Sequence, residues 1–175
     1  MSASISHIKI NSDEINWRNE KGLLTYNDAP AIIIWNQALE ILMMSINEIA
    51  GREKTNEILK KFGTDLGIKV SQSFSNRNDL ENILIEFSDL YRNAGWGNVK
   101  ITTFSKDEKR VVLEIHHSFE ETVFQSINKE QECVFLPSFW ISLIRNLLKD
   151  DMSYTIVKKS VNGIEFDEVK LFLEE

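Results

Sequence analysis

The side chains with the most chemistry to offer lie in one stretch, HHSFEE, which runs from His116 to Glu121. Neighbouring residues of a strand point to opposite faces, so His116 and His117 cannot hold one metal ion together. Acid–base catalysis would need an imidazole beside a carboxylate such as Glu114 or Glu120, and no motif fixes that geometry. Two interpretations stay open: one histidine lines a pocket, or one is a hydrogen-bonded structural histidine and the other is solvated.

Cys133 is the only cysteine of the chain, so no internal disulfide can form. A lone cysteine at the start of a helix is usually a small buried hydrophobe. Nucleophilic catalysis would need a partner base, and no motif places one. A single thiolate cannot make the four-ligand site that structural zinc requires. We therefore expect no metal and no catalytic residue, and we favour a protein that is not an enzyme.

Composition excludes several classes of partner. The 175 residues suit one domain, and their 20 basic and 27 acidic side chains give a formal net charge of −7. The basic residues are scattered, which disfavours a nucleic-acid surface. The longest apolar tract, 133–148, is too short for an ordinary membrane span and indicates a core helix. The amino terminus resembles no signal peptide, so we expect a cytoplasmic protein.

The histidines must be positioned by a predicted β-hairpin over 95–119, in which two apolar runs flank a charged connector. Apolar residues alternate with polar ones in both runs, which is typical of a sheet with one buried face. Just before the hairpin, Gly95 and Gly97 bracket Trp96 and end the preceding helix. This sheet should form the floor of the domain.

Three helices precede this hairpin. Apolar spacings of three and four predict them over 31–50, 53–70 and 79–94, with Pro30 before the first and Trp35 on its apolar face. Gly63 and Gly67 lie one turn apart in the second helix, where each glycine costs roughly 1 kcal/mol relative to alanine. Something must therefore approach that helix closely, either another helix or a ligand.

Two further helices and a closing hairpin follow. We expect helices over 120–127 and 134–148, separated by an exposed charged run at 128–132. Asn162-Gly163 is the preferred pair for a two-residue turn, and it predicts a hairpin of 154–161 with 164–173. The apolar residues of its second strand change parity, which a bulge near Asp167-Glu168 would reconcile.

The predicted fold is therefore α/β of the α+β kind. An antiparallel sheet of about four strands is covered by four to five helices, and residues 1–175 form a single domain. Residues 1–30 make a less well defined amino-terminal lobe, with short apolar runs that suggest a strand or two.

The order of these elements resembles the 4-vinyl reductase domain family over residues 22–173. The resemblance rests on these residues: Gly63, Gly67, Gly95-Trp96-Gly97, Ser118-Phe119, Cys133 and Gly163. The family includes sensor domains of bacterial transcriptional activators for phenol- and toluene-type compounds, and it is related in structure to small subunits of the TRAPP vesicle-tethering complex. It implies a mixed α/β fold, often dimeric, with a pocket for an apolar or aromatic ligand between sheet and helices.

The resemblance also implies a set of ligand-binding residues: Trp96, Phe119, His116, His117, Gly63, Gly67 and Asn93. Two of them depart from the sensor members, because Asn93 lies in the neighbourhood where those have a histidine, and Phe119 stands at the position of their tryptophan. The ligand therefore need not be phenolic. Zinc-containing members use a cysteine before the last long helix, matched here by Cys133, together with a glutamate and two cysteines in the closing hairpin. Those three positions read Ile156, Lys159 and Asp167 here, which again implies no zinc.

Three functions remain as hypotheses. The first is a non-catalytic ligand-binding or regulatory module for a small apolar, aromatic or tetrapyrrole-like molecule. The alternatives are an assembly scaffold related to TRAPP subunits, and a tetrapyrrole-pathway reductase or accessory enzyme. The sequence has no nicotinamide or flavin motif, so we expect no cofactor of its own. We also expect a homodimer through helices and an unidentified protein partner.

Overall fold

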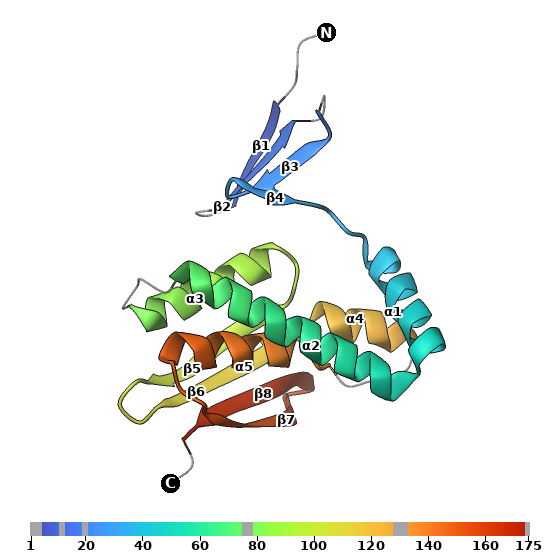
Figure 1. The fold of residues 1–175 in the computed structure, drawn as a ribbon. Helices are drawn as coiled ribbons and strands as arrows, with labels where there is room; N and C mark the ends of the chain where they lie inside the picture. Colours follow the sequence, from blue (N-terminus) through green and yellow to red (C-terminus); the bar gives the residue numbers. More distant parts are fainter. Residues whose placement is uncertain (1–4, 11–12, 19–20, 75–78, 128–132, 174–175) are drawn as a thin grey trace. The chain divides into compact units, whose positions relative to one another are not determined.

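A computed structural model describes residues 5–10, 13–18, 21–74, 79–127 and 133–173. The chain divides into two compact units, Met1–Trp35 and Asn36–Glu175. Each contains a four-stranded antiparallel sheet, and the helices belong to the second unit (Figure 1). The mixed α and β class is the one predicted from the sequence. The charged run 128–132 lies outside the described residues.

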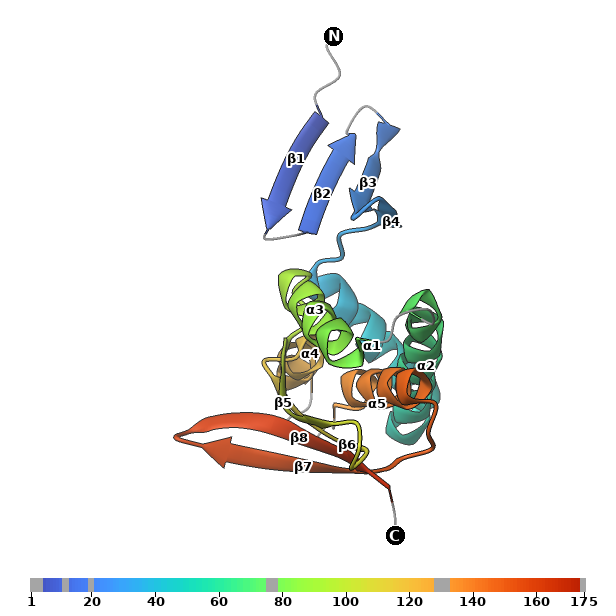
Figure 2. The same ribbon diagram turned by 90° about the vertical axis from the view of Figure 1, so that its left-hand side faces the viewer.

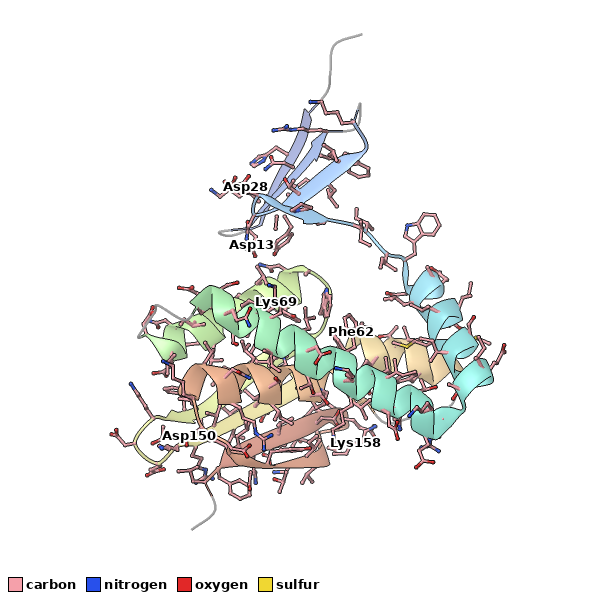
Figure 3. All side chains as sticks on the ribbon, in the orientation of Figure 1. Asp13, Asp28, Phe62, Lys69, Asp150 and Lys158 are labelled. Atoms are coloured by element: carbon pink, nitrogen blue, oxygen red, sulfur yellow. The ribbon has the colours of Figure 1, made fainter. Side chains whose placement is uncertain are left out.

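The first unit is an antiparallel meander with more strands than the sequence suggested. Its strands follow chain order in the sheet: β1 Ile5–Ile10, β2 Asp13–Arg18, β3 Leu23–Tyr26 and β4 Ala29–Ala31. Asn27 and Asp28 join β3 to β4 with φ of 47° and 64°, the left-handed conformation of a two-residue hairpin turn. The Asn27 side chain donates to Asp13 on β2 at 2.8 Å (Figure 3 labels Asp13 and Asp28). This bond ties the turn to the middle of the sheet.

The second unit is a sheet with helices over one face (Figure 2). Its strands are β5 Asn98–Ser105, β6 Arg110–His116, β7 Ser153–Val161 and β8 Ile164–Phe172, in the order β5-β6-β8-β7. Its helices are α1 Asn36–Ala50, α2 Arg52–Ser71, α3 Leu80–Asn93, α4 Phe119–Ile127 and α5 Phe135–Leu148, with a short turn η2 at Gln72–Phe74. This is the predicted four-stranded sheet covered by helices.

Helix α5 forms the centre of the core. Alternate residues of the two inner strands are fully or almost fully buried beneath the helices: Val111, Leu113, Ile115, Val169 and Leu171. Most of α5 is buried between this face and α2, with which it packs along its length. Such a helix is apolar nearly all round because it has neighbours on several sides.

The closing hairpin confirms the turn prediction and corrects the predicted bulge. Asn162 and Gly163 both have positive φ, 54° and 79°, and connect paired strands. The pairing of β7 with β8 runs without a shift from one end to the other. The shift lies in β5 instead, between Ile101 and Thr103. The parity change arises because Phe166 faces the side of the sheet away from the helices.

Helix α1 begins later than predicted. Pro30 lies in β4, and residues 32–35 form an irregular connector before Asn36. Trp35, predicted on the buried face of the helix, precedes it and is 75% exposed. β-Branched isoleucines favour extended backbone, which explains why the connector Ile-Ile-Ile-Trp does not extend the helix.

Candidate functional site

The turn Gly95-Trp96-Gly97 brings Trp96 against Phe119. Gly97 has φ of 140°, and a side chain there would lie 3.1 Å from the Cα of Ser118. The Phe119 amide donates to the Trp96 carbonyl at 3.2 Å, and the two rings are 5.5 Å apart. Phe135, at the start of α5, lies 5.5 Å from Trp96 and 5.6 Å from Phe119. The structure thus brings together two of the predicted ligand-binding residues, in a three-ring cluster.

The cluster continues inwards to Trp140. Tyr91 lies 5.0 Å from Trp96 and 5.9 Å from Trp140, and Phe139 stacks on Tyr91 at 4.8 Å. Burial raises the pKa of the Tyr91 phenol. Trp140 has no exposed surface, and its indole Nε1 has no hydrogen-bond partner among the described residues. An unpaired donor in an aromatic interior is unusual, because such a group normally costs about 1–3 kcal/mol.

Gly63 and Gly67 lie at the contact between α2 and α5. A Cβ at Gly67 would be 2.5 Å from the Phe139 carbonyl oxygen and 2.9 Å from the Leu143 amide nitrogen. A Cβ at Gly63 would clash with the Phe135 carbonyl oxygen. The sequence left open whether another helix or a ligand lies beside these glycines. In the structure it is helix α5, whose backbone fills the space, and no cavity lies there.

The histidines do not join the aromatic cluster. His116 is buried on the sheet face away from the helices, where its ring stacks on Phe166 at 4.7 Å and its Nε2 lies 3.0 Å from Glu114. His117 is exposed and has a left-handed backbone with φ of 50°. This is the arrangement of one structural and one solvated histidine. Asn93, the last residue of α3, is half-buried.

Glu120 has a structural position that the sequence did not reveal. Its fully buried carboxylate accepts the first backbone N–H groups of α5, from Val134 at 3.0 Å, Phe135 at 2.8 Å and Leu136 at 2.8 Å. Burial raises the pKa of Glu120 to about 7 although the three N–H donors oppose that rise. Glu120 is therefore the amino-terminal cap of α5, supplied from 14 or more residues away.

The thiol of Cys133 is poorly suited to catalysis or metal binding. Its Sγ lies 3.6 Å from Ser118 Oγ, and burial together with Glu120 raises its pKa to about 12. Of the positions that the resemblance compared with zinc ligands, Lys159 is paired with Glu168 at 2.8 Å and Asp167 has a pKa raised by burial. Within the described ranges, no three His, Cys, Asp or Glu side chains are grouped to hold a metal ion.

A separate groove of about 540 Å³ lies outside this cluster. Its walls are polar and charged side chains of α2, α5 and the segment after α5: Lys60, Thr64, Ser138, Ser142, Arg145, Asn146, Lys149, Asp150 and Asp151, with Ile141 and Tyr154. Arg145 is already engaged, since its guanidinium donates to the Met152 carbonyl at 2.7 Å and lies over the Tyr154 ring. None of the predicted site residues lines this groove (Figure 3 labels Asp150, one of the lining residues).

Comparison with known proteins identifies the fold. No family model and no curated protein matches the sequence. Among solved structures, the phenol-responsive sensory domain of the transcription activator PoxR, with phenol, is similar at a TM-score of 0.71 and 14% identity, covering 90% of this chain and 84% of that one. An oxygen-binding H-NOX domain related to soluble guanylate cyclases is similar at 0.54 and 14%, covering 84% and 76%. An H-NOX variant of T. tengcongensis gives 0.53 and 13%, covering 84% and 78%.

Two features of the site could not be found by motif. Glu120 was considered only as a carboxylate near the histidines, because a cap from a distant element leaves no local pattern. Trp140 lies within the tract 133–148, which the sequence predicts as a core helix, and the missing partner of its N–H group is visible only in three dimensions.

Among the helices that the structure describes, none has the length and apolarity needed to cross a membrane.

Proposed function

We propose that the unit Asn36–Glu175 is a non-catalytic ligand-binding or regulatory module that takes a small aromatic molecule carrying a hydrogen-bond acceptor. Its fold is that of a phenol-responsive sensory domain and of H-NOX domains. Fold alone does not assign a ligand, so the proposal rests on the site itself.

The observation that carries the proposal is the indole N–H of Trp140. It is completely buried beside Tyr91 and Phe139, and no described residue accepts its hydrogen bond. A ligand oxygen that accepted this bond would remove a cost of about 1–3 kcal/mol. The surrounding rings would hold an aromatic ligand by offset or edge contacts. This chemistry favours a phenol-like ligand over an apolar one such as toluene.

A ligand panel tests the proposal. We would measure the melting temperature of the full chain with phenol, toluene and hemin, which represent the phenolic, apolar and tetrapyrrole classes. Ligand at a hundred times its Kd stabilises by about 2.7 kcal/mol, which for a chain of this size raises the melting temperature by roughly 5–10 °C. Phenol should give this shift and toluene a smaller one.

Trp140→Phe is the decisive variant because it keeps a ring and removes the N–H donor. It should reduce the difference between phenol and toluene, whereas Trp35→Phe, at an exposed tryptophan, should leave that difference unchanged. Absence of a shift with every member of the panel would refute the proposal. Equal shifts for phenol and toluene in the unaltered protein would refute the role of the N–H group.

The alternative function is an assembly scaffold. It is favoured by the close packing of α2 on α5 at Gly63 and Gly67, which leaves no ligand space along that line. Nothing in the site favours the reductase alternative. We also propose, from the sequence, a homodimer, an unidentified protein partner and a cytoplasmic location.

A further inference from the structure

The polar groove between α2 and α5 has no part in the proposed function. Its volume of about 540 Å³ is in the range of small-molecule sites. Gly63 of α2 meets the backbone of Phe135 on α5. Gly67, one turn later, meets that of Leu143, so the two helices run in the same direction along the groove.

The floor of the groove is held by hydrogen bonds. Ile141 and Ser142 are only 5% and 6% exposed. The Ser142 hydroxyl donates to the Thr64 carbonyl at 2.9 Å, which joins the two helices across the floor. The Asn146 amide donates to the Ser142 carbonyl at 2.8 Å, and its Oδ1 makes no bond to a described residue. With the Ser138 hydroxyl, these groups form a row of donors and acceptors that suits the hydroxyl groups of a ligand.

Arg145 is fixed in the wall of the groove and still has free donors. Its Nε and Nη2 both donate to the Met152 carbonyl, and the guanidinium lies 5.2 Å from the centre of the Tyr154 ring. Its Nη1 has no acceptor among the described residues. A guanidinium has five N–H donors in a planar fork that matches phosphate and carboxylate groups. Because this one is already held in place, binding an anion costs it little conformational freedom.

The charges of the groove leave a local excess of positive charge. Asp150 is neutralised by Lys109 at 2.6 Å, and Asp151, whose side chain is 95% exposed, lies 3.5 Å from the guanidinium. In the part of the chain that the structure describes, the ammonium groups of Lys60 and Lys149 have no ion-pair partner. Exposed charges more than about 8 Å apart are largely screened in physiological salt. A small anion in the groove therefore responds to these cations more than to the chain's net charge of −7.

The cations lie towards the two ends of the groove. Lys60 is one turn before Thr64 on α2, near the end that Ser138 lines. Arg145 and Lys149 flank the other end, where α5 stops. From Ser138 to Lys149 the groove extends about 16 Å, at about 1.5 Å per helical residue. This layout suits a ligand with an anionic group at each end and hydroxyl groups between them.

We propose that this groove binds a small polyhydroxylated anion of the sugar-phosphate class, with one phosphate at Lys60 and another at Arg145 and Lys149. The sugar hydroxyls bind between the two ends, where Asn146 offers its free oxygen. Charge-assisted bonds to phosphate supply most of the affinity. This site is separate from the ring cluster around Trp140, so it goes beyond the proposed function and does not depend on it.

Isothermal titration calorimetry of the full chain tests the site with three probes. They are fructose bisphosphate with phosphates on the first and sixth carbons, fructose with a phosphate on the sixth carbon only, and fructose itself. The bisphosphate should bind with saturation, the monophosphate about tenfold more weakly, and fructose not measurably, because each phosphate meets its own cations. Added sodium chloride should weaken the binding of the bisphosphate, since the cations are partly exposed.

Lys60→Glu and Lys149→Glu each reverse the charge at one end of the groove. Each should weaken binding of the bisphosphate about tenfold or more. Lys69→Glu is the matched control, because it makes the same change of charge at an exposed lysine of α2 outside the groove (Figure 3 labels Lys69). It should leave the affinity almost unchanged. Circular dichroism of each variant checks that the fold is intact.

The outcomes separate this site from the ring cluster. Absence of saturable binding of the bisphosphate, or equal affinity for fructose, would refute the proposal. Equal weakening in all three lysine variants would assign the effect to the net charge of the chain and would also refute the groove. Trp140→Phe should not alter binding of the bisphosphate, so a failure of the phenol panel and a failure of this site can be told apart.

Discussion

Replacing Glu120 with glutamine should change how the stability of the protein depends on pH. The carboxylate is fully buried and accepts three backbone N–H groups at the start of α5. Its pKa rises from the ordinary 4.5 to about 7, mainly through burial. Glu120→Gln keeps the shape and removes the charge. The amide oxygen can still accept the bonds from Val134 and Phe135, whereas its NH₂ group faces the Leu136 N–H.

The magnitude follows from the linkage between proton binding and folding. Because the folded protein holds this proton more tightly than the unfolded chain, the stabilisation is complete below pH 4.5 and is lost as the pH rises through about 7. At about 1.4 kcal/mol per pKa unit, the loss between pH 5 and pH 8 is about 2.5 kcal/mol. The glutamine variant does not titrate, so it should lack this loss. Asp167, whose pKa is also raised by burial, is present in both proteins, so comparing them isolates Glu120.

Urea unfolding between pH 5 and pH 8, followed by far-ultraviolet circular dichroism, measures the difference. The free energy of unfolding of the unaltered protein should fall by about 2.5 kcal/mol relative to that of the glutamine variant as the pH rises, so that the two curves approach or cross. At the acidic end the glutamine variant should be less stable by about 1–3 kcal/mol, the cost of one unpaired buried N–H group. Parallel curves for the two proteins would show that Glu120 does not titrate in this range, and the burial argument would then be wrong.

Three other outcomes concern packing, the thiol and metal. Gly67→Ala should lower stability by roughly 1–3 kcal/mol in urea unfolding, because its Cβ meets the Phe139 carbonyl, and unchanged stability would contradict the close contact. Cys133, with a pKa near 12, should react with iodoacetamide about a hundredfold more slowly than glutathione at pH 8, and equal rates would refute its burial. Elemental analysis should find well below one zinc per chain, and a tightly held stoichiometric ion would refute the proposed absence of a zinc site.

Local patterns in the sequence predicted the second unit well. The turn at Asn162-Gly163 was found because two adjacent residues with positive φ have few alternatives. The five helices were found because each has an apolar face with helical spacing. The order β5-β6-β8-β7 required more than local pattern, since it depends on which strand edges meet.

The errors have physical causes too. The bulge near Asp167 was inferred from the parity of apolar residues, on the assumption that all of them face the helices. Phe166 instead lies on the other face, where the ring of His116 covers it. This aromatic pair explains how an apolar residue of the opposite parity is buried without a bulge. The start of α1 was misplaced because Trp35 fits the helical spacing, although the isoleucines before it favour extended backbone.

The site was the least predictable part. Trp96 and Phe119 were chosen from the resemblance, and the structure places them in contact. Glu120 matters through backbone partners that are 14 or more residues away in the sequence. Trp140 matters because its N–H group has no partner among the described residues. Neither condition produces a local sequence motif.

The two glycines of α2 also fix how the protein can move. Along their line, Leu59 precedes Gly63 and Ser71 follows Gly67 at intervals of one turn, and their partners Phe135 and Phe139 are likewise one turn apart. Sliding either helix by a turn would bring a side chain onto backbone that only glycine admits. The register is therefore locked, and α2 and α5 shift as one body. A displacement of α5 at Trp140 would therefore move α2 as well, because the two backbones are in direct contact at Gly63 and Gly67 and no intervening side chains are needed to transmit the movement.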